Sequence, residues 1–110
     1  AEEAKALFHF VRRNIRFTRD INGVETIQTP LVTLQLGQGD CDDHSILLAS
    51  LMESIGHPTR FIAVGFEPDV YEHVFVESKI GAEWTPFDTT EKHNPGWFPP
   101  GVQAKLIMYN

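Results

Sequence analysis

An α+β fold is predicted by the order of the periodic segments along this chain. Apolar residues recur at helical spacing in the first half, whereas the second half carries short strand-like runs. The chain has 110 residues, which suffices for one hydrophobic core and is short for two. We therefore expect a single domain over residues 1–110, in which a buried central helix packs on an antiparallel sheet.

The first segment predicts an amphipathic helix from Glu2 to Asn14. Its apolar residues recur every three or four positions, while lysine and arginine take the other side. Residues 15–18 then resemble an extended stretch, and Ile21-Asn22-Gly23 has the composition of a turn. The chain is therefore expected to leave its first helix through a short strand and a turn.

A short second helix is predicted from the residues at its two ends. Thr29 is a preferred N-cap, Pro30 suits the first helical position, and Gly37 suits the residue that ends a helix. The glycines on both sides of Gln38 then predict a flexible lead-in over residues 37–39.

The third predicted helix is the most apolar. Asp40 precedes it and Asp43 follows three positions later, which is a variant of the capping box. Gly56 suits the left-handed residue behind the helix, and Pro58 prevents its continuation. The apolar residues between these ends cover more than one stripe: Ile46, Leu47, Leu48, Leu51, Met52 and Ile55. This helix should therefore be the buried central one.

Strand-like runs follow the third helix. Arg60 to Phe66 is almost continuously apolar, as expected of a strand that is covered on both faces. Tyr71 to Lys79 and Glu83 to Asp88 are separated by a hairpin signal. His93 to Gly101 is rich in proline and glycine and predicts a loop, after which Val102 to Tyr109 returns as a last strand.

The charge balance argues against a nucleic-acid partner. Nine lysines and arginines against fifteen aspartates and glutamates leave a net charge of −6, the wrong sign for a phosphate-binding surface. One basic cluster is present, and a solvated helix face accounts for it: Arg12, Arg13, Arg16 and Arg19.

Cysteine usage and hydropathy give expectations about the compartment. No apolar run approaches the roughly 20 residues that span a bilayer, and no signal peptide opens the chain, so we expect no membrane partner. Cys41 is the only cysteine, which excludes an intrachain disulfide. Its free thiol favours a reducing, cytoplasmic compartment. No feature of the sequence predicts an oligomeric state.

Cys41 is the first candidate for chemistry. Behind Asp40 as N-cap, its thiol occupies the first helical position, beside backbone N–H groups that no carbonyl satisfies. Those dipoles favour a thiolate, whereas the flanking carboxylates of Asp40, Asp42 and Asp43 oppose it. A nearby imidazolium would decide in favour of the thiolate.

A histidine is supplied by the predicted hairpin. A two-residue loop of Ile80-Gly81 places His73 directly opposite Asp88, with Cβ atoms about 5 Å apart. An aspartate beside a histidine fixes the tautomer of the imidazole and stabilises its charged form. If the central helix packs its N-terminus on this sheet face, Cys41 completes a nucleophile, base and carboxylate.

These motifs together resemble the transglutaminase-like superfamily. They are Gly39-Asp40-Cys41 opening an apolar helix, Gly56 to Arg60 leading into a strand, His73 starting the next strand, and Trp84 to Asp88 after it. The resemblance covers roughly Phe10 to Thr90, and it implies a papain-like fold core, the transglutaminase core, with no cofactor. The superfamily includes cysteine proteases, amidases, acyl transferases that crosslink glutamine to lysine, and members that have lost activity.

The resemblance implies a role for each residue of the constellation. Cys41 would be the nucleophile, His73 the general base and Asp88 the orienting carboxylate of a thiol hydrolase or acyl transferase. Its substrates would be peptide or protein amides. The backbone N–H of Cys41 is the expected first oxyanion donor. Papain-like enzymes add an upstream glutamine, and both Gln35 and Gln38 are near enough in sequence to be considered.

Alternatives remain open at this point. His44 follows Cys41 by three positions and is a rival base, although packing beneath the site or local hydrogen bonding also explains it. The aspartates around Cys41 allow a metal-dependent hydrolase, but their spacing matches no EF-hand or zinc signature, so no metal is expected. A crosslinking enzyme or an inert binding module on the same scaffold are further alternatives. We expect Trp84 to pack near the site and Trp97 to cover the loop.

Overall fold

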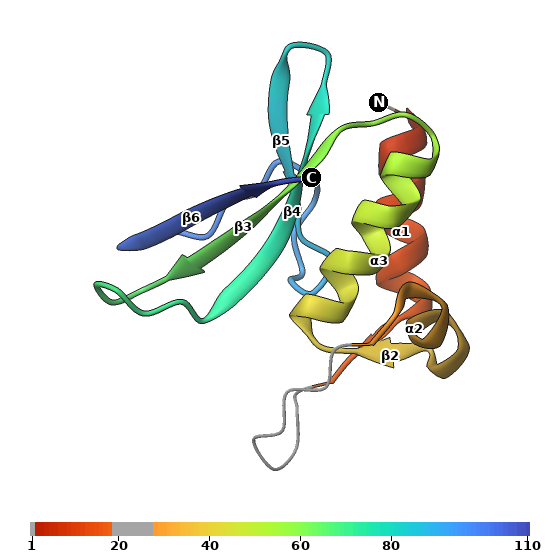
Figure 1. Ribbon diagram of the computed structural model, residues 1–110, viewed down its shortest axis with the longest axis horizontal. Coiled ribbons are helices and arrows are strands. Elements are labelled where there is room, and N and C mark those ends of the chain that lie inside the picture. The colour runs from red at the N-terminus through yellow and green to blue at the C-terminus, as the bar shows by residue number, and fades with distance from the viewer. Residues whose placement is uncertain (1, 19–27) are drawn as a thin grey trace.

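A four-stranded antiparallel sheet with helices against one of its faces forms the body of the protein (Figure 1). The computed structural model describes residues 2–18 and 28–110. The turn expected at Ile21-Asn22-Gly23 and the last member of the basic cluster, Arg19, lie outside these residues. None of the helices in the described part is long and apolar enough to cross a bilayer.

The elements follow the predicted order. The helices are α1 (Glu2–Asn14), α2 (Pro30–Leu36) and α3 (Cys41–Ser54), and the strands are β1 (Arg16–Phe17), β2 (Gln38–Gly39), β3 (Thr59–Gly65), β4 (His73–Ile80), β5 (Glu83–Phe87) and β6 (Ala104–Tyr109). The α+β prediction is confirmed, and the four strands of the main sheet begin and end within about two residues of the predicted bounds. Their order across the sheet is β5-β4-β3-β6.

The predicted helix ends are confirmed by their capping contacts. In α2 the Thr29 hydroxyl accepts a hydrogen bond from the Val32 N–H, and Gly37 adopts the left-handed conformation at φ 67°. In α3 the side chains of Asp40 and Asp43 form the reciprocal capping box. Behind α3, Gly56 has φ 89°, as a helix-ending glycine should.

The flexible lead-in expected over residues 37–39 is instead an ordered strand. Gln38 and Gly39 form β2, which pairs in parallel with β1 through Arg16 and Phe17. The N–H groups of Arg16 and Thr18 donate to the carbonyls of Gly37 and Gly39, at 2.8 and 2.9 Å. This pairing joins segments that are distant in sequence, so no local composition signal predicts it. Its consequence is that the approach to α3 is held in place.

The core lies between the helices and the sheet. Phe8 and Val11 of α1, Leu47 of α3, and Val76 of β4 are all fully or almost fully buried there. A second apolar cluster covers the opposite face of the sheet, where Ile62, Val64 and Phe75 pack against side chains that include Phe98 and Val102 from the loop before β6. Apolar side chains therefore cover both faces of β3, as predicted from its continuous apolar run. The prediction of a buried central helix is also confirmed.

The predicted register of the β4–β5 hairpin is wrong. The turn residues are Gly81 and Ala82, and the ladder pairs Ile80 with Glu83. Gly81 thus occupies the first central position of the turn, with φ 66°, because the tight turns of two-residue hairpin loops need positive φ there. As a result, His73 and Asp88 are not opposite each other in the ladder.

Candidate active site

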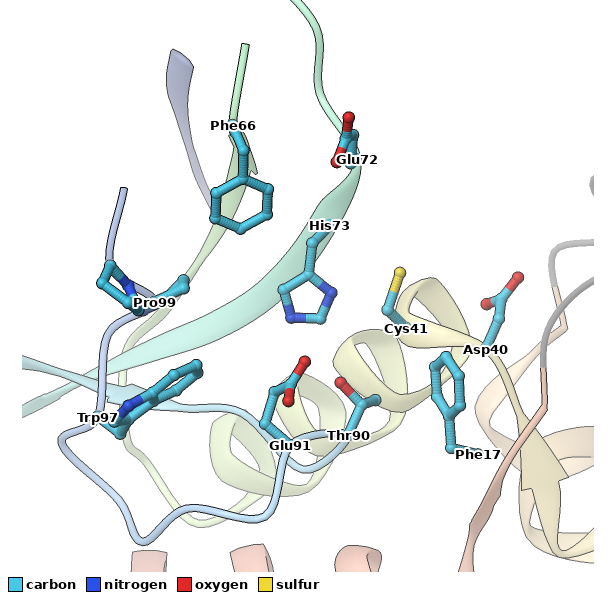
Figure 2. Close-up of a pocket in the computed structure, with 11 residues that line it drawn as sticks. Phe17, Asp40, Cys41, Phe66, Glu72, His73, Thr90, Glu91, Trp97 and Pro99 are labelled. Atoms are coloured by element: carbon cyan, nitrogen blue, oxygen red, sulfur yellow. The ribbon is translucent and has the colours of Figure 1, made fainter. Parts of the chain in front are cut away.

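Cys41 is the first residue of α3, and its thiol is partly exposed at the edge of a cleft (Figure 2). The helix start is fixed by two hydrogen bonds of 3.1 Å: the Asp43 N–H donates to Asp40, and the Asp40 N–H donates to Asp43. Gly39 approaches this box so closely that a Cβ atom on it would lie 2.6 Å from the Cβ of Asp43. The position of the thiol is therefore set by tight packing around the first turn of α3.

His73 begins β4, and its ring is held by a carboxylate. Nε2 of His73 lies 2.5 Å from Oδ2 of Asp88, and the two side chains are only 16% and 4% exposed. The other oxygen of Asp88 accepts hydrogen bonds from the backbone N–H and the hydroxyl of Thr90, at 3.1 and 2.8 Å. Asp88 is thus anchored by its own chain segment, just beyond β5, while it contacts the imidazole.

The two opposing influences on His73 are burial and its neighbours. Burial lowers the pKa of His73, but the hydrogen bond with Asp88 and the contact with Cys41 outweigh it, and their negative charges add to the effect. The net result raises the pKa of His73 from 6.5 to about 10. The imidazole is therefore the charged imidazolium at neutral pH.

Cys41 and His73 face each other across the cleft. Figure 2 shows the side chain of Cys41, on α3, beside the ring of His73, on β4, and the contact between the two side chains helps to raise the pKa of His73. Because Nε2 contacts Asp88, the remaining ring nitrogen, Nδ1, is the one on the side of the thiol. The structure thus places the three predicted residues next to each other, in the order sulfur, imidazole and carboxylate. An imidazolium in this position stabilises an anionic sulfur and can give a proton to a departing amine.

The cleft around this pair has a volume of about 740 Å³. Five separate segments contribute to its wall: Phe17, Asp40 and Cys41, Phe66, Glu72 and His73, and the stretch from Thr90 to Pro100. Three of the residues that line it carry carboxylates (Asp40, Glu72 and Glu91), and three carry aromatic rings (Phe17, Phe66 and Trp97). No lysine or arginine lines the cleft within the part of the chain that the structure describes.

His44 lies behind the cleft and does not line it. Its side chain is 1% exposed, and its Nδ1 shares a 2.8 Å hydrogen bond with the Thr89 hydroxyl. Burial lowers the pKa of His44, against weaker opposing effects of the Arg16 backbone and of the charges on Asp88 and Asp40. This placement agrees with packing beneath the site rather than with the role of a rival base.

Asp40 and Asp43, on either side of Cys41, are used in the local structure. Asp43 accepts hydrogen bonds from the Asp40 N–H with one carboxylate oxygen and from the Gln28 N–H, at 2.9 Å, with the other. Within residues 2–18 and 28–110, no three histidine, cysteine, aspartate or glutamate side chains converge in a way that could hold a metal ion.

Three of the residues predicted near the site lie elsewhere. Gln35 and Gln38 are exposed, and neither lines the cleft. Trp84, which we expected near the site, instead packs against Arg60 and Tyr109, with the Arg60 guanidinium 4.3 Å from the centre of its ring. The register of β5 explains this difference, because Trp84 pairs with a residue at the far end of β4 from His73.

The sequence does not predict several other residues of the cleft. Trp97 was expected only to cover the loop; it stacks on His93 at 4.0 Å between ring centres and also forms part of the cleft wall. Glu72 could have been found, since it directly precedes His73 at the start of a strand. Phe17 and Glu91 carry no comparable local signal, because their places depend on the β1–β2 pairing and on the loop after β5.

Comparison with models of known protein families assigns the chain to one family. The profile of the transglutaminase-like superfamily matches residues 1–89. This match covers most of the chain, so the protein belongs to the transglutaminase-like superfamily. A comparison with curated protein sequences gives no significant match.

Solved structures share the same papain-like fold. A candidate cysteine protease from Cytophaga hutchinsonii has a TM-score of 0.65 at 22% identity, over 97% of this chain and 40% of its own. Calcium-bound LapG from Legionella pneumophila has a TM-score of 0.71 at 16% identity, over 98% of this chain and 67% of its own. EGTA-treated LapG has a TM-score of 0.65 at 18% identity, over 84% of this chain and 54% of its own. The chain thus spans two fifths of the Cytophaga protein, and at these identities the likeness establishes the fold.

Proposed function

We propose that this protein is a thiol-dependent hydrolase of peptide or side-chain amides, with Cys41 as nucleophile, His73 as general acid and base, and Asp88 as the orienting carboxylate. The observation that carries the proposal is the His73 ring, which contacts Asp88 through Nε2 and faces the Cys41 sulfur with its other side. Superfamily membership and the likeness to a candidate cysteine protease support a general role of thiol-protease type.

The reaction would proceed in two steps. The sulfur of Cys41 attacks the amide carbon, the C–N bond breaks, and His73 gives its proton to the departing amine, leaving a thioester. A water molecule then gives a proton to His73 while its oxygen attacks the thioester carbon. The C–S bond breaks, the carboxylic acid leaves, and the thiolate and imidazolium are restored. The backbone N–H of Cys41, at the start of α3, is the proposed donor to the oxyanion.

Transfer to a second amine is the runner-up reaction. It shares the thioester and differs only in what attacks it, so a crosslinking enzyme would use the same three residues. We favour hydrolysis because water is always present, whereas transfer needs an ordered site for the incoming amine. Ammonia release from glutamine peptides, measured with and without an added primary amine, separates the two: transfer incorporates the amine into the peptide, and hydrolysis yields glutamate.

The lining of the cleft favours cationic substrates. Glu72 and Glu91 lie on opposite sides of His73 in Figure 2, and Trp97 lines the same cleft. Carboxylates attract lysine and arginine side chains, and an aromatic face adds a cation–π contact. We therefore propose that the enzyme prefers peptides that carry a basic side chain beside the scissile amide.

The decisive experiment measures the reactivity of Cys41 without assuming a substrate. Iodoacetamide should label Cys41 faster at pH 7 than it labels a model thiol, and the His73→Ala variant should be labelled more slowly. Equal labelling rates in the two proteins would contradict the proposal and favour an inert binding module. A substrate-derived thioester on Cys41, detected by mass spectrometry after a rapid acid quench, would identify the acyl group.

A further inference from the structure

We propose that His44 is a positioning residue, which holds the first turn of α3 against the segment that carries Asp88 and so sets the distance between the thiol and the imidazole. The inference rests on the proposed function, because the position of the thiol matters only if Cys41 is the nucleophile. It concerns a buried histidine to which the reaction itself gives no role.

The contact that carries the inference joins two buried side chains. Nδ1 of His44 lies 2.8 Å from Oγ1 of Thr89, and the two residues are 1% and 7% exposed. Forty-five positions separate them in the sequence, so the bond ties together elements that the chain does not hold in register. Breaking a hydrogen bond that is shielded from water leaves buried polar atoms unpaired, which costs free energy. The bond therefore holds the two side chains in one relative position.

Each end of this bond is next to a residue of the site. Thr89 stands between Asp88, which contacts His73, and Thr90, which anchors the carboxylate of Asp88. His44 follows Cys41 by three positions, and residues at this spacing lie on the same side of a helix. Movement of His44 relative to Thr89 would therefore move the thiol relative to the imidazole.

A second tie acts on the neighbouring residue of the helix. The hydroxyl of Ser45 donates a hydrogen bond of 3.3 Å to the carbonyl of Val74, the residue after His73. The first turns of α3 are thus attached both to β4, which carries the imidazole, and to the segment after β5, which carries the carboxylate. Of the two ties, the one through His44 is the shorter and the more buried.

The chemistry of His44 suits a structural link beside a charged site. Its burial favours the neutral ring, so the link adds no second cation near the imidazolium of His73. Its ring also feels the backbone of Arg16, and it lies 6.3 Å from the ring of Phe17, which lines the cleft. His44 touches the wall of the cleft from behind and does not reach a substrate, so it acts through its neighbours.

The test removes the bond from either end. Thr89→Val deletes the hydroxyl at nearly constant volume, and His44→Leu deletes the ring nitrogen. Each should slow iodoacetamide labelling of Cys41 at pH 7 by about two- to tenfold, the range of one hydrogen bond. Each should also lower the pKa of His73, measured by NMR titration of its ring, because the contact with Cys41 weakens. Combining the two variants should add little, since one bond is lost in both.

Two further variants separate positioning from mere stability. His44→Asn places an amide nitrogen close to the position of Nδ1 and should restore the labelling rate and the pKa of His73. Ser78→Ala removes a partly buried 2.8 Å hydrogen bond to the Pro58 carbonyl, remote from the cleft. It should lower the melting temperature without changing either readout. If His44→Leu does not fold, Thr89→Val and His44→Asn decide.

One result would overturn the inference. If Thr89→Val melts at a lower temperature, as Ser78→Ala should, but keeps the labelling rate and the His73 pKa of the wild type, then His44 serves stability alone. Neither readout requires turnover of an amide. The two proposals can therefore fail separately. A wild-type protein that has a reactive thiol but hydrolyses no amide would contradict the proposed function, and the effect of His44 on Cys41 could still be measured in it.

Discussion

The carboxylate of Asp88 lies 2.5 Å from Nε2 of His73, although the two residues are not opposite each other in the sheet. The β4–β5 ladder ends at Val76 and Phe87, so Asp88 reaches the imidazole from the turn that follows β5. The hydrogen bonds from Thr90 hold it there. The orientation of His73 therefore depends on a short irregular segment rather than on cross-strand pairing.

This relationship predicts the effect of Asp88→Asn. An amide has no charge to stabilise the imidazolium, so the pKa of His73 should fall below its wild-type value of about 10. Amide hydrolysis should fall by about 10²- to 10⁴-fold, because the ring loses both its orientation and its charge stabilisation. Turnover assays and an NMR titration of His73 measure the two effects. Full activity with the lowered pKa would show that the carboxylate has no role in catalysis.

The raised pKa of His73 also predicts how stability depends on pH. The folded protein holds a proton on this ring up to about pH 10, whereas the unfolded chain releases it near pH 6.5. The contribution of the protonated His73 ring to the free energy of unfolding is therefore complete below pH 6.5. It declines as the pH rises, and it is lost once the pH exceeds about 10. Urea unfolding at pH 6, 8 and 10 should show that the free energy of unfolding declines less with rising pH in His73→Ala than in the wild type. Parallel declines in the two proteins would contradict the raised pKa.

The local features of this fold could be predicted from the sequence, whereas those that depend on distant segments could not. The ends of α2 and α3 follow from Thr29, Asp40 and Gly56, whose side chains or backbone act within a few residues. Cys41, His73 and Asp88 could be named, but the hairpin register that led to the last two was wrong. The predicted register failed because Gly81, with its positive φ, occupies the first central position of the turn rather than the second. A turn that starts one residue later changes every cross-strand pair of the hairpin.

Replacement of the nucleophile separates the thiol mechanism from a metal-dependent one. Cys41→Ser should abolish hydrolysis and thioester formation, since a serine hydroxyl in this setting is not ionised by His73. Addition of the chelator EGTA to the wild type tests whether hydrolysis depends on a bound metal ion. Activity that survives Cys41→Ser and disappears with EGTA would assign the chemistry to the aspartates of the first turn of α3. The unfolding midpoint of Cys41→Ser should match the wild type, which makes the loss of activity attributable to the sulfur.

The carboxylates of the cleft predict a dependence on substrate charge. Glu72→Gln and Glu91→Gln should each raise KM for a lysine-containing peptide by about two- to fivefold at low salt and leave kcat nearly unchanged. The difference should shrink as salt screens the attraction. Glu83→Gln, which removes an exposed carboxylate at the far end of β5, is the matched control and should change nothing. Equal KM values for lysine-containing and neutral peptides in the wild type would contradict the preference.

Gly39→Ala should disturb the site through packing alone. Gly39 is buried, and an added Cβ would lie 2.6 Å from the Cβ of Asp43, so the first turn of α3 must shift. Overpacking of this kind costs about 1–3 kcal/mol in the free energy of unfolding. The shift should also slow labelling of Cys41, because Asp43 and Asp40 fix the start of the helix that carries it. Ser50→Ala, on the exposed side of the same helix, should leave both measurements near the wild type. A Gly39→Ala protein with wild-type stability and labelling would show that the close approach is readily relieved.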